Sequence, residues 1–296
     1  MKSTIRQTPI RSIIFIVIGA AFIAACTVLA KVAQSDIFGN PLHPLQVAQG
    51  RFMFAFIAVA LATPLIRPEF TKPNLIIHSV RTLCGYGAVS FLFAAAAIIP
   101  VSDATAIKFL NPVFAMVFAL PILREKIGLM RWVAAFIGLA GSMILIRPTE
   151  GSFEPAALMA LIASLSAGLE MVLIKFLTGK EDPKQILLIN NAIGLFLSSI
   201  ALVVVWDTPT TAQWIILAAI GFLMVIGQAC NLQALKGADA TFVLPFSYST
   251  LIFVTIYDFS VFYVVPDLTS YIGAAVIILG ALLLTVPEMR KARLIR

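Results

Sequence analysis

The chain has 296 residues, of which 60% are hydrophobic and only 12% are charged, and its mean hydropathy is +1.01. A soluble domain carries about 25% charged residues, so this composition excludes a soluble globular protein and indicates a polytopic membrane protein. The formal net charge is +7. The basic residues lie in short connectors and not on one face, which argues against nucleic acid as a partner.

The three cysteines, Cys26, Cys84 and Cys230, lie inside apolar segments and lack the spacing of a metal site. We interpret them as small packing residues, and we expect no metal, no cofactor and no catalytic residue. The first apolar segment is longer than the hydrophobic region of a signal peptide and carries no clean cleavage site, so we expect it to be the first span.

Ten apolar segments are long enough to cross the roughly 30 Å hydrocarbon core of a bilayer as helices. The sequence therefore predicts an all-α polytopic membrane protein, and Pro, Gly and Asn mark its short connectors. The expected spans are residues 12–34, 45–66, 74–98, 102–121, 129–147, 155–178, 184–206, 212–234, 238–263 and 268–287.

The fourth span is expected to be broken, because Asn111-Pro112 lies near its middle. Proline removes a backbone donor and clashes with the carbonyl one turn back, so the helix should bend between residues 109 and 112. In a membrane such a break is tolerated where protein or a water-filled cavity satisfies the freed groups. The break therefore indicates an interior, functional surface.

Lysine and arginine predict the orientation. With the N-terminus inside, the inner segments hold fifteen of these residues and the outer connectors hold one, Arg147. We therefore expect both termini in the cytoplasm of a bacterial cell, with the chain in the cytoplasmic (inner) membrane.

Weak internal matches keep their order along the chain. Residues 102–105, SDAT, recur as ADAT at 238–241, and Pro112 in the fourth span has a counterpart in Pro245 of the ninth. The sequence thus predicts two repeats of five spans, over 12–147 and 155–287. An odd number of spans per repeat gives the repeats opposite orientations, an architecture found in transporters with a central solute site.

The pattern A-x-x-x-P-x-S-x-A-x-A…P-V-F…L-R-E-K-x-G…R-W…G-L-x-G…I-R-P, from Ala96 to Pro148, resembles the EamA family of the drug/metabolite transporter superfamily. The resemblance covers nearly the whole chain and implies a ten-helix secondary transporter that moves small polar metabolites by alternating access. His78-Ser79-Val80-Arg81, with Arg51, resembles a subgroup that includes riboflavin and S-adenosylmethionine carriers. One departure is Asp267 after Pro266, where the family has Gly-Glu.

Ionisable residues inside spans are functional candidates, because inserting one costs about 2.5–3.5 kcal/mol at the centre of a helix. Lys108 shares a helical face with Thr105, Asn111 and Pro112, so we expect it to line a cavity, with snorkelling to the outer interface as the alternative. Cavity lining and snorkelling stay open for Arg51. For His78 and Arg81, near the cytoplasmic end of span three, headgroup contact stays open.

Two acids lie within spans, Glu170 and Asp258. We expect Glu170 to face the interior and to pair with a Lys or Arg of another span or to accept a coupling proton. Asp258 is either a substrate contact or the partner of Lys108 in an interhelical ion pair. The uncharged candidates for the solute site are Gln228, Asn231, Pro245 and Tyr248.

These features favour a secondary transporter that moves a small polar solute across the lipid bilayer; the solute is anionic or zwitterionic, with a planar ring as a further option. A passive facilitator or channel for the same solute is the alternative, because it needs the same spans but not two exclusive states. An intramembrane enzyme would need a constellation of acids or histidines, and the spans hold one histidine and two isolated acids. Glycines at 138, 141, 273 and 280 should let spans five and ten pack closely, with a homodimer face as a further option.

Overall fold

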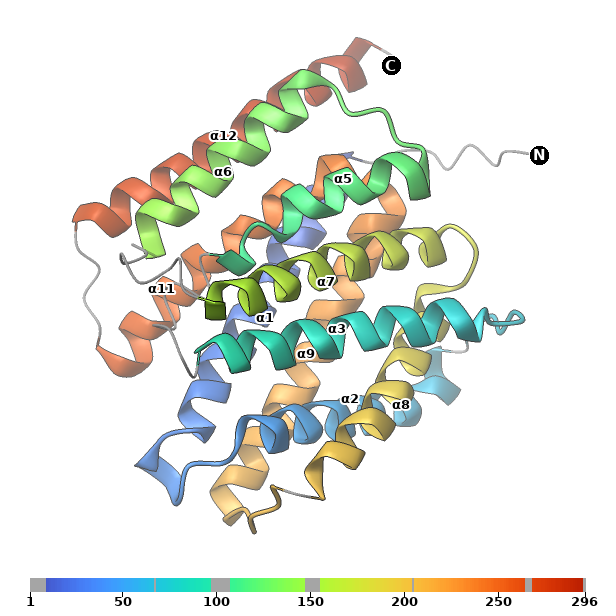
Figure 1. The fold of residues 1–296 in the computed structure, drawn as a ribbon. Coiled ribbons are helices and arrows are strands. Elements are labelled where there is room, and N and C mark those ends of the chain that lie inside the picture. Colours follow the sequence, from blue (N-terminus) through green and yellow to red (C-terminus); the bar gives the residue numbers. More distant parts are fainter. Residues whose placement is uncertain are drawn as a thin grey trace.

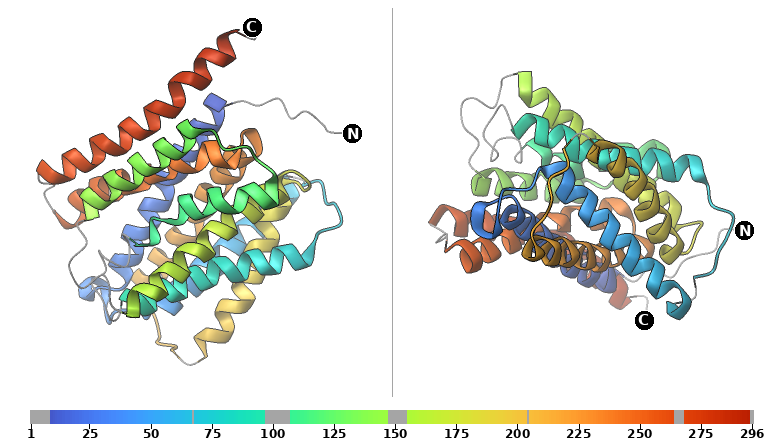
Figure 2. Two further views of the ribbon diagram at one scale, coloured as in Figure 1. Left: turned by 45° about the horizontal axis from the view of Figure 1, so that its top comes forward. Right: turned by 90° about the horizontal axis from the view of Figure 1, so that it is seen from below.

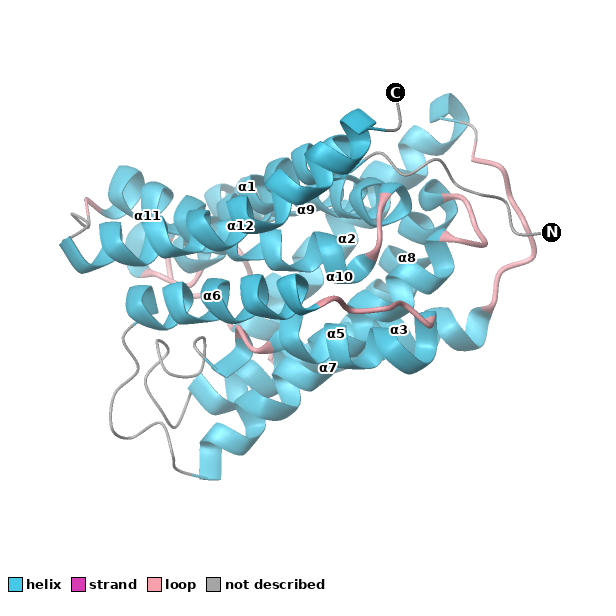
Figure 3. Cartoon of the chain, turned by 90° about the horizontal axis from the view of Figure 1, so that it is seen from above, coloured by secondary structure: helices cyan, strands magenta, loops and turns pink. Residues whose placement is uncertain are grey.

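The computed structural model of the chain describes residues 9–66, 68–96, 107–146, 155–203, 205–263 and 268–294, and these residues contain helices and no strand (Figure 3). The elements are α1 (Pro9–Ala33), η1 (Asp36–Phe38), α2 (Pro44–Ile66), α3 (Leu75–Ala96), α5 (Asn111–Leu123), α6 (Leu129–Ile146), α7 (Pro155–Thr178), α8 (Pro183–Leu202), α9 (Thr211–Gly237), α10 (Ala240–Val243), η3 (Leu244–Tyr248), α11 (Ser249–Phe262) and α12 (Leu268–Leu294). The expectation of an all-helical chain is confirmed for the described residues.

The helix starts follow from local chemistry. Helices α1, α2, α7 and α8 each begin at a proline, whose fixed φ suits the first helical turn and whose missing N–H needs no partner there. Asp182 caps α8 by accepting a hydrogen bond from the backbone N–H of Lys184. Thr210 and Gln213 form a capping box at the start of α9, so its first turn satisfies its own backbone donors.

Seven helical segments are long and apolar enough to cross a membrane, and they occupy the places of expected spans one to three and six to nine. Three shorter apolar helices, over 111–123, 129–144 and 271–280, occupy the places of spans four, five and ten. The chain is a multi-pass membrane protein by these measures. Ten complete crossings stay a prediction, because residues 97–106, where span four would begin, lie outside the described residues.

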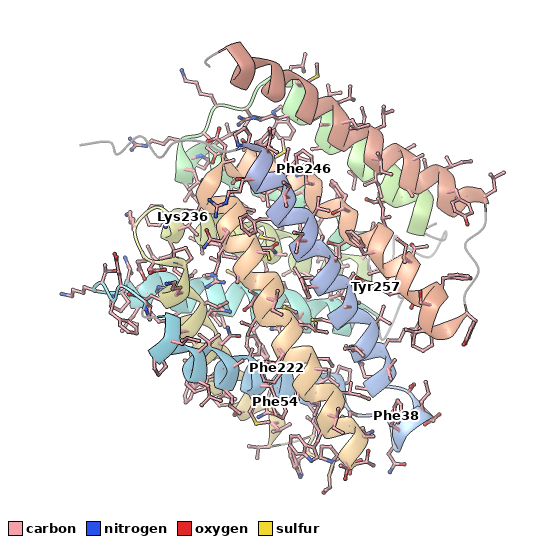
Figure 4. The ribbon with its side chains drawn as sticks, turned by 180° about the vertical axis from the view of Figure 1, so that it is seen from behind. Phe38, Phe54, Phe222, Lys236, Phe246 and Tyr257 are labelled. Atoms are coloured by element: carbon pink, nitrogen blue, oxygen red, sulfur yellow. The ribbon has the colours of Figure 1, made fainter. Side chains whose placement is uncertain are left out.

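Close helix packing builds the bundle in Figure 1. Helix α1 packs against α9 and α11, α3 against α7 and α8, and α2 against α8 and α9. Glycines permit the closest approaches, because a Cβ on Gly221 would lie 2.4 Å from the Phe54 Cβ of α2, and one on Gly19 would lie 3.1 Å from the Gly227 carbonyl oxygen. Phe54 and Phe222 are labelled beside the first of these contacts in Figure 4.

Helices α6 and α12 lie side by side along one edge of the bundle (Figures 1 and 2). The expected glycines make this contact, because a Cβ on Gly141 would lie 2.9 Å from the Gly273 carbonyl oxygen, and one on Gly280 would lie 3.1 Å from the Ala134 carbonyl oxygen. Spans five and ten therefore pack closely within one chain. These glycines are covered by that contact, which gives no support to a homodimer formed through them.

The loops meet in two groups at opposite ends of the bundle. At one end, Thr210 donates to the Phe38 carbonyl and Gln213 donates to the Asn40 carbonyl. At the other end, residues 68–74 bond to the loop after α7 and to the start of α8, where Gln185 accepts from the Thr71 N–H. Phe38 and Lys236, labelled in Figure 4, lie toward opposite ends of α9. Each group joins loops that the charge distribution places on one side of the membrane.

We predict that a cysteine introduced at Asn40 is labelled only from outside the cell and one at Lys180 only from inside. Both positions are exposed, and the native Cys26, Cys84 and Cys230 are replaced by alanine in both variants. Labelling by a membrane-impermeant maleimide, before and after the membrane is permeabilised, measures the orientation. Labelling of position 180 in intact cells would contradict the prediction.

Candidate functional site

The fourth apolar segment is broken where the proline predicts it. Residues 107–108 are helical, Phe109 and Leu110 form a turn, and α5 starts at Asn111 with Pro112 in its first turn. Pro112 has no N–H for the Lys108 carbonyl, and Ser164 Oγ of α7 donates to that carbonyl instead, at 3.0 Å. The Tyr248 hydroxyl donates to the neighbouring Phe109 carbonyl at 3.1 Å. Side chains of the second half thus satisfy the backbone freed in the first half.

The ninth segment is broken as well. It divides into α10, η3 and α11, with Pro245 in the 3-10 turn η3. Element η3 contacts α5, and the rings of Tyr248 and Phe109 lie 6.0 Å apart. The two broken segments therefore meet, as the paired prolines predict. Tyr248 itself is fully buried against Gly138, where a Cβ would lie 2.6 Å from its ring, so it is a packing residue and does not line a cavity.

Glu170 of α7 is the centre of a group of charges that we call the charge cluster and that also contains Arg51, Arg81 and Lys108. Arg81 is buried, and the other three side chains are partly exposed. Arg81, Arg51 and Lys108 all attract the Glu170 carboxylate, with Arg81 exerting the largest effect. They come from α2, α3 and the segment before α5, so four separate segments supply the four charges. The expected ion pair between Glu170 and a Lys or Arg of another span is not formed within 4.0 Å among the described residues, although three basic residues of other segments lie near enough to attract the carboxylate.

The helix contacts give the order of these charges along the bundle axis. A Cβ on Gly85 of α3 would lie 2.6 Å from Glu170 Oε1, so α3 and α7 touch at this level. Arg81 lies about 6 Å from Gly85 along α3, and Ser164, which binds the Lys108 carbonyl, lies about 9 Å from Glu170 along α7. The start of α3 meets the end of α7, where Asn74 N–H donates to Glu181. Glu170 therefore lies between Arg81 and Lys108.

Arg51 and Lys108 lie near each other as well as near the carboxylate. Their charges repel each other, and both retain partly accessible surface although they lie deep in the fold. The Arg51 guanidinium carbon also lies 4.0 Å from the centre of the Phe52 ring, a cation–π contact. Cavity lining stays a prediction for Arg51 and Lys108, with snorkelling to the outer interface as the alternative.

The structure buries the two residues at the start of α3 for which headgroup contact was left open. His78 is 0% exposed and Arg81 is 2% exposed. Arg81 was not among the residues expected to contact solute, yet it affects the Glu170 carboxylate more than Arg51 or Lys108 does. A signal was available, because His78, Arg81 and Gly85 fall on one helical face and glycine on a polar face indicates close approach of another group.

His78 has its own partner, Glu181, in the loop after α7, with 2.9 Å between Nε2 and Oε2. Burial acts to raise the pKa of the Glu181 carboxyl, but hydrogen bonds from His78, the Asn74 N–H and Gln185 outweigh it and hold this pKa below its ordinary value of 4.5. The pair therefore ties the start of α3 to the α7–α8 loop at neutral pH.

Asp258 does not pair with Lys108. Its carboxylate lies 3.2 Å from Lys31 Nζ of α1, and the Lys31 side chain is 55% exposed. Lys31 also lies 4.3 Å from the centre of the Phe262 ring. The pairing expected for Lys108 is wrong, because Asp258 lies at the far end of α11 from the break. An exposed pair of this kind contributes about 0–1 kcal/mol.

The remaining candidates take different places. Gln228 accepts a hydrogen bond from Asn191 of α8 at 3.2 Å, which makes it an interhelical contact. The Asn231 side-chain oxygen is buried without a hydrogen-bond partner beside Gly19. Asn111 has its backbone carbonyl next to Gly168, where a Cβ would lie 3.0 Å away. Thr105, with Asp103 and Asp267, lies outside the described residues.

A second polar network joins the two halves at the end where α9 finishes. The Glu125 carboxylate accepts hydrogen bonds from the backbone N–H groups of Ala240 and Thr241, at 2.9 and 3.0 Å, and from the Thr241 hydroxyl at 2.7 Å. Arg131 pairs with Asp239 at 3.0 Å. Lys175 Nζ donates to the carbonyls of Leu235 and Ala238. We call this group of contacts the inner network; the other end carries the Lys31–Asp258 pair and the hydrogen bonds of Thr210 and Gln213 to residues 38 and 40.

An outward-facing apolar groove lies elsewhere, between α2, α3 and α8. Its lining residues are Phe56, Ala60, Thr63, Leu75, Leu188, Ile189, Ala192 and Ile193. The groove has no charged lining residue and no member of the charge cluster, so its chemistry is that of a surface in contact with lipid.

The EamA-like transporter family model matches the chain twice, over residues 10–147 and 154–286. A curated riboflavin transporter of Vibrio cholerae is 27% identical over 98% of this chain and 98% of its own length. An S-adenosylmethionine uptake transporter of Rickettsia bellii is 27% identical over 88% of this chain and 90% of its own. These matches indicate a transporter and not an enzyme.

A more distant relative is the pseudopaline exporter CntI of Pseudomonas aeruginosa, 23% identical over 70% of this chain and 73% of its own. A solved crystal structure superposes with a TM-score of 0.75 at 20% identity, covering 93% of this chain and 98% of that one. At that identity the superposition shows a shared fold.

We predict that Ser164→Ala lowers the free energy of unfolding by about 1–3 kcal/mol, because it leaves the Lys108 carbonyl without a donor. In a Pro112→Ala background the restored N–H can serve that carbonyl, so the same change should cost much less. Denaturation of the purified protein measures both costs. Ser166→Ala, on another face of α7, is the control, and equal costs in both backgrounds would contradict the prediction.

We predict that Gly85→Ala destabilises the protein by about 1–3 kcal/mol, because its methyl group would overlap Glu170. Gly87→Ala on the same helix meets nothing within 4 Å and is the matched control. In a Glu170→Ala background the cost of Gly85→Ala should disappear. Thermal midpoints of the four variants measure this, and a cost that persists without the Glu170 side chain would refute the contact.

Proposed function

Because this chain belongs to the EamA-like transporter family, we propose that it is a secondary transporter that moves a small polar metabolite, anionic or zwitterionic, by alternating access. The observation that carries the proposal is the charge cluster. Four charged side chains from four apolar segments gather beside a broken helix, and buried charge at such a break is typical of a transport site.

Two inverted repeats, over 12–147 and 155–287, are part of this proposal. The helix contacts support it, because exchanging the halves maps each contact pair onto another: α1–α9 onto α7–α3, α1–α11 onto α7–α5, and α2–α9 onto α8–α3. The counterparts α5 and α11 also end alike, on the left-handed residues Arg124 (φ 54°) and Tyr263 (φ 56°). Alternating access would then exchange the conformations of the two halves.

The polar contacts at the two ends support an asymmetric state. The inner network joins the segment after α5 and helix α6 to the start of α10, and α7 to the end of α9, through partly buried hydrogen bonds and the Arg131–Asp239 ion pair. The opposite end carries the partly exposed Lys31–Asp258 pair and the hydrogen bonds of Thr210 and Gln213 to residues 38 and 40, so ion pairing between side chains of the two halves takes a different form at each end. We propose that the inner network closes the cytoplasmic side in this state and must open to release solute inward. With the N-terminus inside, as the charge distribution predicts, this is the inner membrane's cytoplasmic face.

The solute class rests on charge and on relatives. Three cations face one carboxylate in the charge cluster, which favours a solute with a negatively charged group. The relatives named for riboflavin and S-adenosylmethionine make these metabolites the first candidates to test. Residues proposed to contact solute are Lys108, Arg51, Glu170 and Asn111, while Gln228 and Tyr248 hold helices together.

A thermal-shift screen of the purified protein against metabolites, with riboflavin and S-adenosylmethionine included, identifies a solute, because a ligand that binds only the folded state raises the midpoint. Proteoliposomes loaded with that solute then test the mechanism by counterflow. A carrier shows faster uptake of labelled solute when unlabelled solute is inside. Uptake without this acceleration would favour the facilitator and would overturn alternating access.

We predict that Lys108→Met lowers counterflow at least about tenfold while the thermal midpoint changes little, because the ammonium serves the solute and not the fold. Lys180→Met, at an exposed position outside the cluster, is the matched control. Asp258→Asn should not reproduce the loss, since Asp258 pairs with Lys31. Counterflow at the wild-type rate in Lys108→Met would remove Lys108 from the site.

A further inference from the structure

The Arg81 guanidinium is buried and has hydrogen-bond donors without an acceptor. Its side chain is 2% exposed, and its Nε and Nη1 atoms are buried without a hydrogen-bond partner. A buried guanidinium with unmade hydrogen bonds is costly, so an arrangement of this kind persists where a further group completes it.

Glu170 does not complete it. The carboxylate attracts Arg81 more than any other charged group, yet Glu170 forms no ion pair within 4.0 Å among the described residues. Its atoms lie against Gly85, one helical turn away from Arg81 along α3. The carboxylate is thus held between the cations on either side and is bound closely to neither.

The charge cluster is also unbalanced. Among the described residues, its three cations and one carboxylate leave an excess of two positive charges. The other charged side chains within the apolar helices have partners: Lys31 pairs with Asp258, and Lys175 is attracted by Glu125 and Asp239 and donates to two carbonyls. The excess charge therefore belongs to this one place in the fold.

We propose that the charge cluster binds a dianionic solute, a dicarboxylate or a phosphate monoester, whose negatively charged oxygens are bound by Arg81, Lys108 and Arg51. This inference deepens the proposed function and rests on it. Two negative charges neutralise the excess of two positive charges, whereas a cation would add to it. Arg81 and Lys108 lie on opposite sides of Glu170, so a dicarboxylate would place one carboxylate at each of them, whereas a phosphate monoester would place its single dianionic group between them.

Glu170 has a defined part in this proposal. It is the internal counter-anion that holds the three cations together when no solute is bound, and it competes with the solute for them. Removing its charge while keeping its shape should therefore strengthen the binding of an anion. A carboxylate that instead bound a positively charged group of the solute would give the opposite result.

Probes of similar length and different charge test the solute class on the purified full-length protein. These are succinate with two negative charges, succinamide with none, and 1,4-diaminobutane with two positive charges; glycerol 3-phosphate represents phosphate monoesters. We expect succinate or glycerol 3-phosphate, but not the other two, to raise the thermal midpoint in a saturable way. A larger rise of the midpoint with succinate indicates a dicarboxylate site, and a larger rise with glycerol 3-phosphate indicates a phosphate site.

Two substitutions test the roles of the residues. For whichever of succinate and glycerol 3-phosphate raises the midpoint, Arg81→Gln should raise the dissociation constant at least tenfold, and Glu170→Gln should lower it at least tenfold. Lys180→Gln, at an exposed position outside the cluster, should leave it unchanged. If Arg81→Gln does not fold, Glu170→Gln decides alone, because tighter binding of a dianion cannot come from a damaged fold.

Stabilisation by the diamine, stabilisation by none of the probes, or weaker or unchanged dianion binding by Glu170→Gln would each overturn the inference. These outcomes leave the proposed function intact if another metabolite shows counterflow. The absence of counterflow for a solute that does bind would overturn alternating access and not the dianion site.

Discussion

The constraint on which this structure depends is that backbone groups freed inside a membrane must find partners within the protein. Pro112 has no N–H and so leaves the Lys108 carbonyl without its helical partner. The turn at residues 109–110 leaves the Phe109 carbonyl without one as well. Ser164 and Tyr248, both from the second half of the chain, donate to these two oxygens. The break in one half can therefore exist only when the other half is packed against it. These contacts hold Lys108 and Asn111 at the place where the two halves meet.

The same contact relates the fold to transport. A helix that ends and restarts at mid-membrane can place a charged side chain in the interior without crossing a continuous apolar helix. Lys108 lies at that place, and Arg51, Arg81 and Glu170 approach it from three packed helices. At Gly221 and Gly138, by contrast, neighbouring helices are packed in direct contact.

Patterns along the chain were sufficient to predict the helices and the two breaks, because proline and hydropathy act locally. They also indicated that Glu170 is interior, since exposing a carboxylate to lipid within a span is costly. The partners of charged groups could not be predicted, because they depend on how helices rotate against each other. Asp258 met Lys31 and not Lys108, and Arg81 turned inward to Glu170 although its position near the helix end was equally suited to headgroups. The one sequence signal for the inward orientation of Arg81 was the helical face that it shares with His78 and Gly85. That signal could be interpreted only once α7 was known to pack against this face.

The packing of α6 against α12 has a consequence for biosynthesis. Helix α6 ends at Ile146, and its main partner is complete only at Leu294, 148 residues later. At a synthesis rate of about 5–20 residues per second, α6 waits roughly 7–30 s in the membrane before α12 emerges. During that time the small-residue face around Gly138 and Gly141 is open to lipid or to other helices. A membrane chaperone that shields glycine-rich helix faces would act on this chain in that interval, and chains truncated before α12 would keep the face exposed and be subject to quality control.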